Sequence, residues 1–171
     1  MRYMRGHAMH KERRFFFPDV GVAFRLTNVA SAIACAQVER RQEIIERREN
    51  FFKRYNNNLR DIPGILLRPV MTWAKLSPWV FPIRVDENLF GKNRDQLANE
   101  LLKKGIETRP LYIPLPYLPP YRQENIIEEN LREMFHNSFK LSYDAMYLPS
   151  STDITDDAID EVCDAIKNCS A

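Results

Sequence analysis

The sequence predicts an α/β (α+β) domain of two layers, in which helices cover a small sheet that is mostly antiparallel or mixed. One long amphipathic helix is indicated first, because apolar residues between 38 and 59 recur at steps of three and four. Short apolar runs typical of strands follow at 65–68, 79–85, 106–112 and 145–148. Further helical patterns lie between or after these runs, at 93–104, at 126–144 and after Thr155.

The first 24 residues predict a basic and aromatic arm, separate from a compact domain at 25–171. Residues 1–14 hold five Arg or Lys side chains against one acidic side chain, and three phenylalanines follow at 15–17. Such a run is usually solvated, although clustered arginines also suit phosphate oxygens. Two interpretations of the arm therefore stay open: a solvated segment, or one that helps to hold an anionic ligand.

The helical part after the arm has recognisable start and stop signals. Thr27 or Asn28 is expected to cap a helix that begins at Val29. The long helix at 38–59 carries its charged residues on the face opposite the apolar stripe. Pro63 and Gly64 should end this helical region.

The second half is expected to alternate strands and helices. Pro82 lies inside the strand at 79–85 and favours an edge position or a bulge, because proline donates no ladder hydrogen bond. The helix at 93–104 should turn three leucines, Leu97, Leu101 and Leu102, inward and end at Gly105. Four prolines at 113–121 predict a loop too rigid for a helix or a ladder.

Composition and charge exclude several classes of protein and partner. Hydrophobic residues make up 44% and charged residues 28%, which is typical of a globular protein, and a net charge of +2 gives no bulk field for nucleic acid. No apolar run approaches the roughly 20 residues that span a bilayer. Cys35, Cys163 and Cys169 form no CxxC pair, which favours reduced thiols in a cytoplasmic protein. His7, His10 and His136 lack the spacing of a metal site.

Three ordered blocks of residues carry a family resemblance. The first block has a glycine, an aromatic–Arg–Leu group, spaced alanines and a glutamine, at Gly21, Phe24, Arg25, Leu26, Ala32, Ala36 and Gln37. The second runs from a Gly–Ile pair through an arginine into the prolines, at Gly105, Ile106, Arg109, Pro110, Pro114, Pro119, Pro120 and Tyr121. The third is a Leu–Pro pair followed by an acidic and aliphatic helix, at 145–166.

These blocks resemble the DegT/DnrJ/EryC1/StrS family of pyridoxal-phosphate-dependent nucleotide-sugar aminotransferases, and residues 5–21 resemble perosamine synthases in particular. The resemblance implies the small domain of a fold-type I enzyme, with one long N-terminal helix. It implies transfer of an amino group to a nucleotide-linked keto-sugar. It also implies that Arg25, Arg109 and Tyr112 lie near the substrate. Alternatively, Arg109 pairs with a helix carboxylate, and Tyr112 and Trp79 belong to the core, where aromatic side chains are common.

The same resemblance places the cofactor lysine upstream of everything matched in this chain. None of the lysines present follows a strand in the family's manner, so we expect no catalytic residue, no cofactor-binding residue and no metal site here. Two departures remove polar groups: Ala23 stands where the family has an asparagine, and Pro116 where it often has a histidine. We therefore expect the large lysine-bearing domain to be absent and the chain alone to be inactive and to bind no pyridoxal phosphate.

The expected partners follow from the same blocks and from the arm. A homodimer or a separate N-terminal half would supply the missing surface, and the intact family acts on nucleotide-sugars. An alternative is a non-catalytic dimerisation or interaction module, because the phenylalanines at 15–17 would form an apolar patch. Binding of nucleic acid would rest on the basic arm alone, and no membrane partner is expected.

Overall fold

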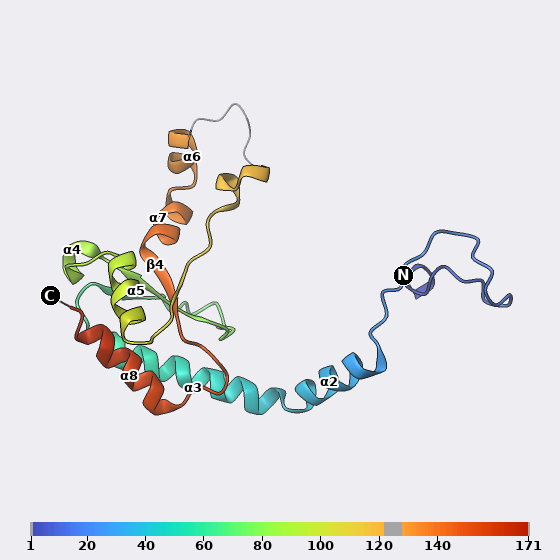
Figure 1. Ribbon diagram of the computed structural model, residues 1–171, viewed down its shortest axis with the longest axis horizontal. Helices are drawn as coiled ribbons and strands as arrows, with labels where there is room; N and C mark the ends of the chain where they lie inside the picture. Colours follow the sequence, from blue (N-terminus) through green and yellow to red (C-terminus); the bar gives the residue numbers. More distant parts are fainter. Residues whose placement is uncertain (1, 122–127, 171) are drawn as a thin grey trace. The chain divides into compact units, whose positions relative to one another are not determined.

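The computed structural model describes residues 2–121 and 128–170, which divide into two compact units (Figure 1). The first unit is Met1–Glu43 and the second is Ile44–Ala171. No helix within the described ranges is long and apolar enough to cross a membrane.

The first unit is built from a hairpin-like arm and one helix. After α1 (Arg2–Arg5), the chain returns so that Gly6 and Ala23 form an antiparallel bridge. Gly21 lies against the opposite backbone, because a Cβ at this position would stand 2.2 Å from the carbonyl carbon of His7. The close approach of the two backbone segments therefore requires glycine there.

The helix of the first unit begins where the sequence predicts. In α2 (Asn28–Glu39), the hydroxyl of Thr27 accepts a hydrogen bond from the Ala30 amide at 3.2 Å, so Thr27 is the N-cap. Among the described residues before position 44, only Ala8 is buried. Phe24, for example, is 77% exposed, and Ile33 on α2 is exposed as well. The first unit therefore has no hydrophobic core of its own.

The second unit contains a four-stranded sheet in the order β1-β2-β4-β3, with all neighbours antiparallel. Its strands are β1 (Ile65–Leu67), β2 (Phe81–Val85), β3 (Arg109–Pro110) and β4 (Ala145–Leu148). The predicted small antiparallel sheet is confirmed. β3 is much shorter than the predicted 106–112, because its ladder with β4 consists of only two residue pairs.

The prediction that Pro82 marks an edge strand is wrong, because β2 lies between β1 and β4. The ladder between β1 and β2 runs from the Ile65–Val85 pair to the Leu67–Ile83 pair. Pro82 lies just beyond the end of β1, so its missing N–H leaves no gap in that ladder.

One face of the sheet is covered by three helices, and the core lies between these two layers. The helices are α3 (Arg41–Leu59), α5 (Arg94–Lys103) and α8 (Asp156–Lys167). Phe52 and Tyr55 of α3 contact the ring of Phe81 on β2, and Ile159 and Ile166 of α8 are fully buried. The later part of the apolar stripe predicted for the long helix, from Phe51 to Leu59, therefore faces the core, whereas Val38 and Ile45 are exposed. That helix begins at 41 rather than 38, because the chain turns at Arg40.

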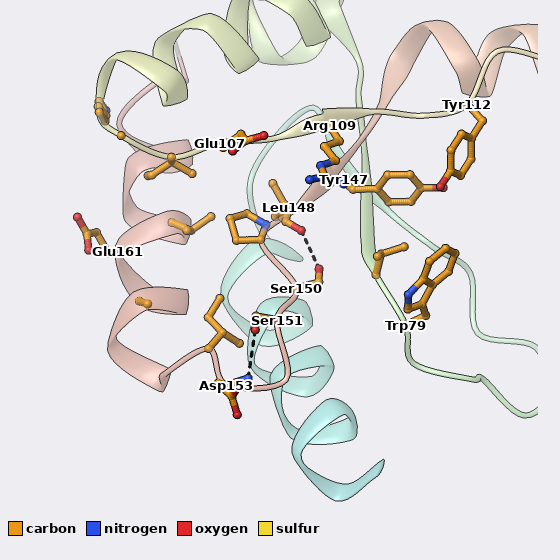
Figure 2. Close-up of a pocket in the computed structure, with 18 residues that line it drawn as sticks. Trp79, Glu107, Arg109, Tyr112, Tyr147, Leu148, Ser150, Ser151, Asp153 and Glu161 are labelled. Atoms are coloured by element: carbon orange, nitrogen blue, oxygen red, sulfur yellow. Dashed lines mark hydrogen bonds between the residues drawn. The ribbon is translucent and has the colours of Figure 1, made fainter. Parts of the chain in front are cut away.

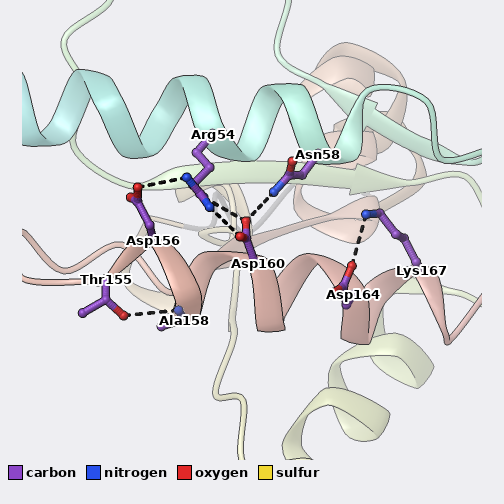
Figure 3. Close-up of polar contacts among 8 residues, drawn as sticks. All are labelled: Arg54, Asn58, Thr155, Asp156, Ala158, Asp160, Asp164 and Lys167. Atoms are coloured by element: carbon purple, nitrogen blue, oxygen red, sulfur yellow. Dashed lines mark hydrogen bonds and ion pairs between the residues drawn. The ribbon is translucent and has the colours of Figure 1, made fainter.

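Polar side chains fix α8 against α3 at the edge of this core, as Figure 3 shows. The guanidinium of Arg54 donates to Asp156 at 2.9 Å and to Asp160 through Nε at 2.8 Å. The amide of Asn58 donates to the same Asp160 carboxylate at 2.8 Å. Thr155 caps α8, as predicted, by accepting from the Ala158 amide.

The remaining elements differ from the predictions mainly in length. The short helix α4 (Glu87–Phe90) was not predicted, and Leu102 of α5 is exposed rather than inward. Two 3-10 turns, Leu115–Tyr117 and Pro119–Tyr121, form within the proline-rich loop that was expected to hold no helix. The helix expected at 126–144 is divided into α6 (Glu128–Met134) and α7 (His136–Asp144), and positions 126 and 127 lie outside the described residues.

Candidate functional site

The largest cavity described in the second unit has a volume of about 750 Å³ (Figure 2). It lies where β3 and β4 meet the start of β2 and the loop that leads into α8. The side chains that matter for its chemistry are Trp79, Arg109, Tyr112, Tyr147 and Ser150. Two of the three residues that the resemblance places near a substrate, Arg109 and Tyr112, therefore line one cavity.

Pairing of β3 with β4 brings the polar and aromatic groups of this cavity together. Arg109 is opposite Tyr147 in the antiparallel register, so both side chains extend from the same face of the sheet. The ring of Tyr112 meets that of Tyr147 edge to face, with centroids 6.0 Å apart. Partial burial, and then the neighbouring Tyr112, raise the pKa of Tyr147, so its hydroxyl stays protonated at neutral pH.

The exposure of these side chains decides between the alternatives left open by the sequence. Trp79 is 63% exposed and Tyr112 is 71% exposed, so the interpretation that they belong to the core is wrong. Arg109 is exposed and pairs with no carboxylate among the described residues, so the helix salt bridge is absent there too. An aromatic surface beside an unpaired guanidinium suits a ligand that combines a flat ring with anionic oxygens.

Two residues that the sequence did not indicate hold the walls of the cavity in place. Arg48 of α3 donates to the carbonyl oxygen of Trp79 at 2.6 Å and to the hydroxyl of Thr152 at 2.8 Å. The hydroxyl of Ser150 accepts from the Phe81 amide at 2.8 Å and donates to a nearby carbonyl. The only sequence signal for Arg48 is its position within the apolar stripe of the long helix.

Arg25, the third residue of the predicted set, lies in the first unit. Its guanidinium covers Gly6, since a Cβ at Gly6 would lie 3.1 Å from Arg25 Nη2. Ala23, at the position of the family's asparagine, pairs with Gly6 in the antiparallel bridge. Pro116, at the position of the family's histidine, lies in the 3-10 turn Leu115–Tyr117 of the second unit.

Pyridoxal phosphate, which the resemblance implies, requires a lysine for its aldehyde and a cradle of donors for its phosphate. Lys104 lines the cavity, but its Nζ donates to the Ala165 carbonyl at 3.4 Å and lies 3.7 Å from the sulfur of Cys169. The helix N-terminus nearest the cavity carries Asp156 and Asp157, which repel a phosphate. The described residues of this cavity therefore do not fit the cofactor.

Comparison with known sequences identifies the family. The model of the DegT/DnrJ/EryC1/StrS aminotransferase family matches residues 1–167. GDP-perosamine synthase of Caulobacter vibrioides is 32% identical over 167 residues, which cover 97% of this chain and 43% of that enzyme. GDP-perosamine synthase of Vibrio cholerae is 31% identical over 156 residues, which cover 91% of this chain and 41% of that enzyme.

Solved structures agree on the fold. The aminotransferase TlmJ from Streptoalloteichus hindustanus superimposes with a TM-score of 0.80 at 21% identity, over 98% of this chain and 43% of that one. PseC of Helicobacter pylori, an aminotransferase involved in the biosynthesis of pseudoaminic acid, gives a TM-score of 0.77 at 20% identity, over 98% and 44%. The chain thus spans less than half the length of the relatives it matches. By its sequence, this chain belongs to the DegT/DnrJ/EryC1/StrS aminotransferase family, whose members depend on pyridoxal phosphate.

Proposed function

We propose that this chain forms one part of an aminotransferase that aminates a nucleotide-linked keto-sugar, and that it is inactive alone. In this proposal a domain outside these 171 residues provides the lysine and the phosphate cradle of pyridoxal phosphate. The cavity around Arg109 contributes the surface that meets the nucleotide-sugar. The observation that carries the proposal is the meeting of Trp79, Arg109, Tyr112 and Tyr147 in one cavity of a chain similar to GDP-perosamine synthases.

The chemistry of the cavity supports a nucleotide-sugar better than a purely apolar ligand. The guanidinium of Arg109 suits phosphate oxygens, because its planar donors match them in pairs. The exposed rings of Trp79 and Tyr112 suit a nucleobase or the apolar face of a sugar. Arg48 holds the backbone at Trp79 through the Trp79 carbonyl, and Ser150 holds the start of β2 through the Phe81 amide.

Tryptophan fluorescence tests ligand binding directly, since Trp73 and Trp79 are the only two tryptophans of the chain. With Trp73→Phe, Trp79 becomes the sole reporter, and titration with GDP-mannose is expected to quench its emission to saturation. Adding Arg109→Gln should raise the Kd about tenfold, because a charge-assisted contact is lost. The matched exposed change Lys53→Gln on α3 should leave the Kd unaltered. Quenching that is equal in the Arg109→Gln and Lys53→Gln chains contradicts the proposal.

The proposed need for a lysine-bearing domain outside these residues has its own test. The purified chain is mixed with pyridoxal phosphate, reduced with borohydride and examined by intact-protein mass spectrometry. No stoichiometric adduct is expected, because Lys104 is engaged with α8 and the described N-terminus of α8 is acidic. A stable one-to-one adduct on a single lysine would show that the chain carries its own cofactor site.

A non-catalytic interaction module is the second candidate, and the exposed apolar surface of the first unit favours it. With Ala8 as the only buried side chain described there, residues such as Phe24 and Ile33 remain in water unless another chain covers them. The proposed occupant is a second copy of this chain. Gel filtration with light scattering should then give a dimer, and Ile33→Glu should convert it to a monomer. A monomer whose arm exchanges amide protons freely would exclude this candidate.

A further inference from the structure

The face of the sheet opposite the core carries a second hollow, which is separate from the cavity around Arg109. Along β2, Phe81, Ile83 and Val85 are buried toward the core, so Pro82 and Arg84 extend from the other face. Helix α7 lies against this face, and the hollow between them, here termed the α7 groove, has a volume of about 570 Å³. A volume of this size is typical of small-molecule sites.

The α7 groove combines apolar walls with a cationic rim. Leu66, Pro82 and Leu141 provide apolar walls, while Arg68, Arg84 and Lys140 provide the positive charge. No acidic side chain lines the groove within the described residues. The nearest carboxylate with a described contact is Asp144, which accepts a hydrogen bond from Arg84 Nη2 at 3.1 Å.

Two of the three cations have no partner among the described residues, and the third is only partly satisfied. Arg68 and Lys140 are exposed and form no described ion pair or hydrogen bond. Arg84 uses Nη2 for Asp144, but its Nε is buried and donates to no described acceptor. Arg68 and Lys140 therefore leave two positive charges at the groove that no described carboxylate neutralises.

We propose that the α7 groove binds an organic anion with a short apolar body. The anionic head, a phosphate or a carboxylate, is attracted by Arg68 and Lys140 at the rim, and Arg84 adds to the positive charge. The apolar body lies along Leu66, Pro82 and Leu141. Both features are needed, because the rim alone is a solvated set of cations and the walls alone lack specificity. The proposal does not depend on the function proposed for the cavity around Arg109.

The test is a chemical-shift titration of the whole, isotope-labelled chain with hexyl phosphate, hexanoate, hexanol and inorganic phosphate. Hexyl phosphate and hexanoate are expected to shift the amides at 66–68, 83–84 and 137–141 to saturation, and their relative Kd values identify the preferred head. The Kd values of hexanol and of inorganic phosphate should each be at least about tenfold higher than that of hexyl phosphate, since each compound lacks one of the two features. Equal binding of hexanol, or shifts concentrated at 2–14, would overturn the proposal.

Matched substitutions locate the site. Lys140→Gln is expected to raise the Kd of hexyl phosphate about threefold, as for an exposed charge pair. Arg68→Gln should raise the Kd by a similar factor, because it removes the other exposed cation of the rim. Lys53→Gln, on a helix that covers the opposite face, should leave the Kd unchanged. A Kd that responds to Lys53→Gln as much as to Lys140→Gln, in folded chains, would refute the α7 groove as the site.

Discussion

At the scale of single residues, two arginines of α3 contact different parts of the fold although they lie only six positions apart. Arg48 reaches the loops at the cavity, through the Trp79 carbonyl and the Thr152 hydroxyl. Arg54 instead joins α3 to α8, through Asp156 and Asp160. Both were placed on one helix by the periodic pattern, but which distant groups they meet depends on the tertiary fold.

The Arg54–Asp160 contact gives a prediction about acid stability. The hydrogen bond from Arg54 lowers the pKa of Asp160 below its ordinary value, and Asn58 adds to this. A carboxyl whose folded pKa is lowered stabilises the fold above its unfolded pKa of about 3.9, and this stability is lost as the pH falls through the folded value.

Replacement Arg54→Met should therefore lower the urea midpoint at pH 7 and flatten its fall as the pH drops below about 4. The matched control is Arg60→Met, because Arg60 bonds only the adjacent Asp61 among its described contacts. Urea unfolding followed by circular dichroism measures both effects. An acid dependence that is equally steep in the Arg54→Met chain and the original chain would show that this contact contributes no pH dependence.

At the scale of elements, two glycines with the same backbone conformation separate two costs of adding a Cβ: the strain of a left-handed backbone and the clash with neighbouring atoms. Gly64 and Gly105 both have φ of +80°. A Cβ at Gly64 would lie 2.4 Å from the Phe90 amide nitrogen, whereas a Cβ at Gly105 would meet nothing within 4 Å. Gly105→Ala should therefore cost only left-handed strain, about 1–2 kcal/mol of unfolding free energy.

Gly64→Ala carries the same strain and also forces β1 away from α4 (Glu87–Phe90), so its cost should exceed that of Gly105→Ala by more than about 1 kcal/mol. Chemical denaturation of the two variants measures the difference. Equal losses of stability would mean that the contact of Gly64 with Phe90 is not tight in solution.

The sequence predicted correctly those elements whose ends and buried faces are set by neighbouring residues. β4 was predicted with its observed bounds, because a short apolar run stops at Pro149, and α8 was predicted from the Thr155 cap and its buried face. The central position of β2 was missed. Proline is tolerated there because the ladder with β1 ends just before Pro82, and the local sequence does not show where that pairing ends. In the candidate site, Arg109 and Tyr112 came from family resemblance, whereas Tyr147 joined them only through the β3–β4 register.

At the scale of the whole molecule, the two units differ in what stabilises them. The second unit has a continuous core between the sheet and its helices, and the described part of the first has a single buried residue. Backbone segments with few buried contacts open at low free energy. Brief trypsin treatment of the intact chain should therefore cut first within 2–41, where arginines are frequent, and leave a resistant fragment that starts near 42.

Lys53 provides the internal comparison for that digestion, because it is exposed but lies in the middle of α3. Mass spectrometry of the early fragments shows which bonds are cut. Cleavage after Lys53 as fast as cleavage within 2–41 would mean that the second unit is no more stable than the first.

The proposal that remains to be tested is that these residues act only together with a domain that carries the lysine. The direct measurement is glutamate-dependent amination of a GDP-linked 4-keto-6-deoxymannose, followed by mass spectrometry. Three samples are compared: this chain, the lysine-bearing portion of the Caulobacter vibrioides GDP-perosamine synthase that it does not match, and their mixture. The amino-sugar is expected in the mixture alone. Turnover by this chain without the lysine-bearing portion would contradict the proposal.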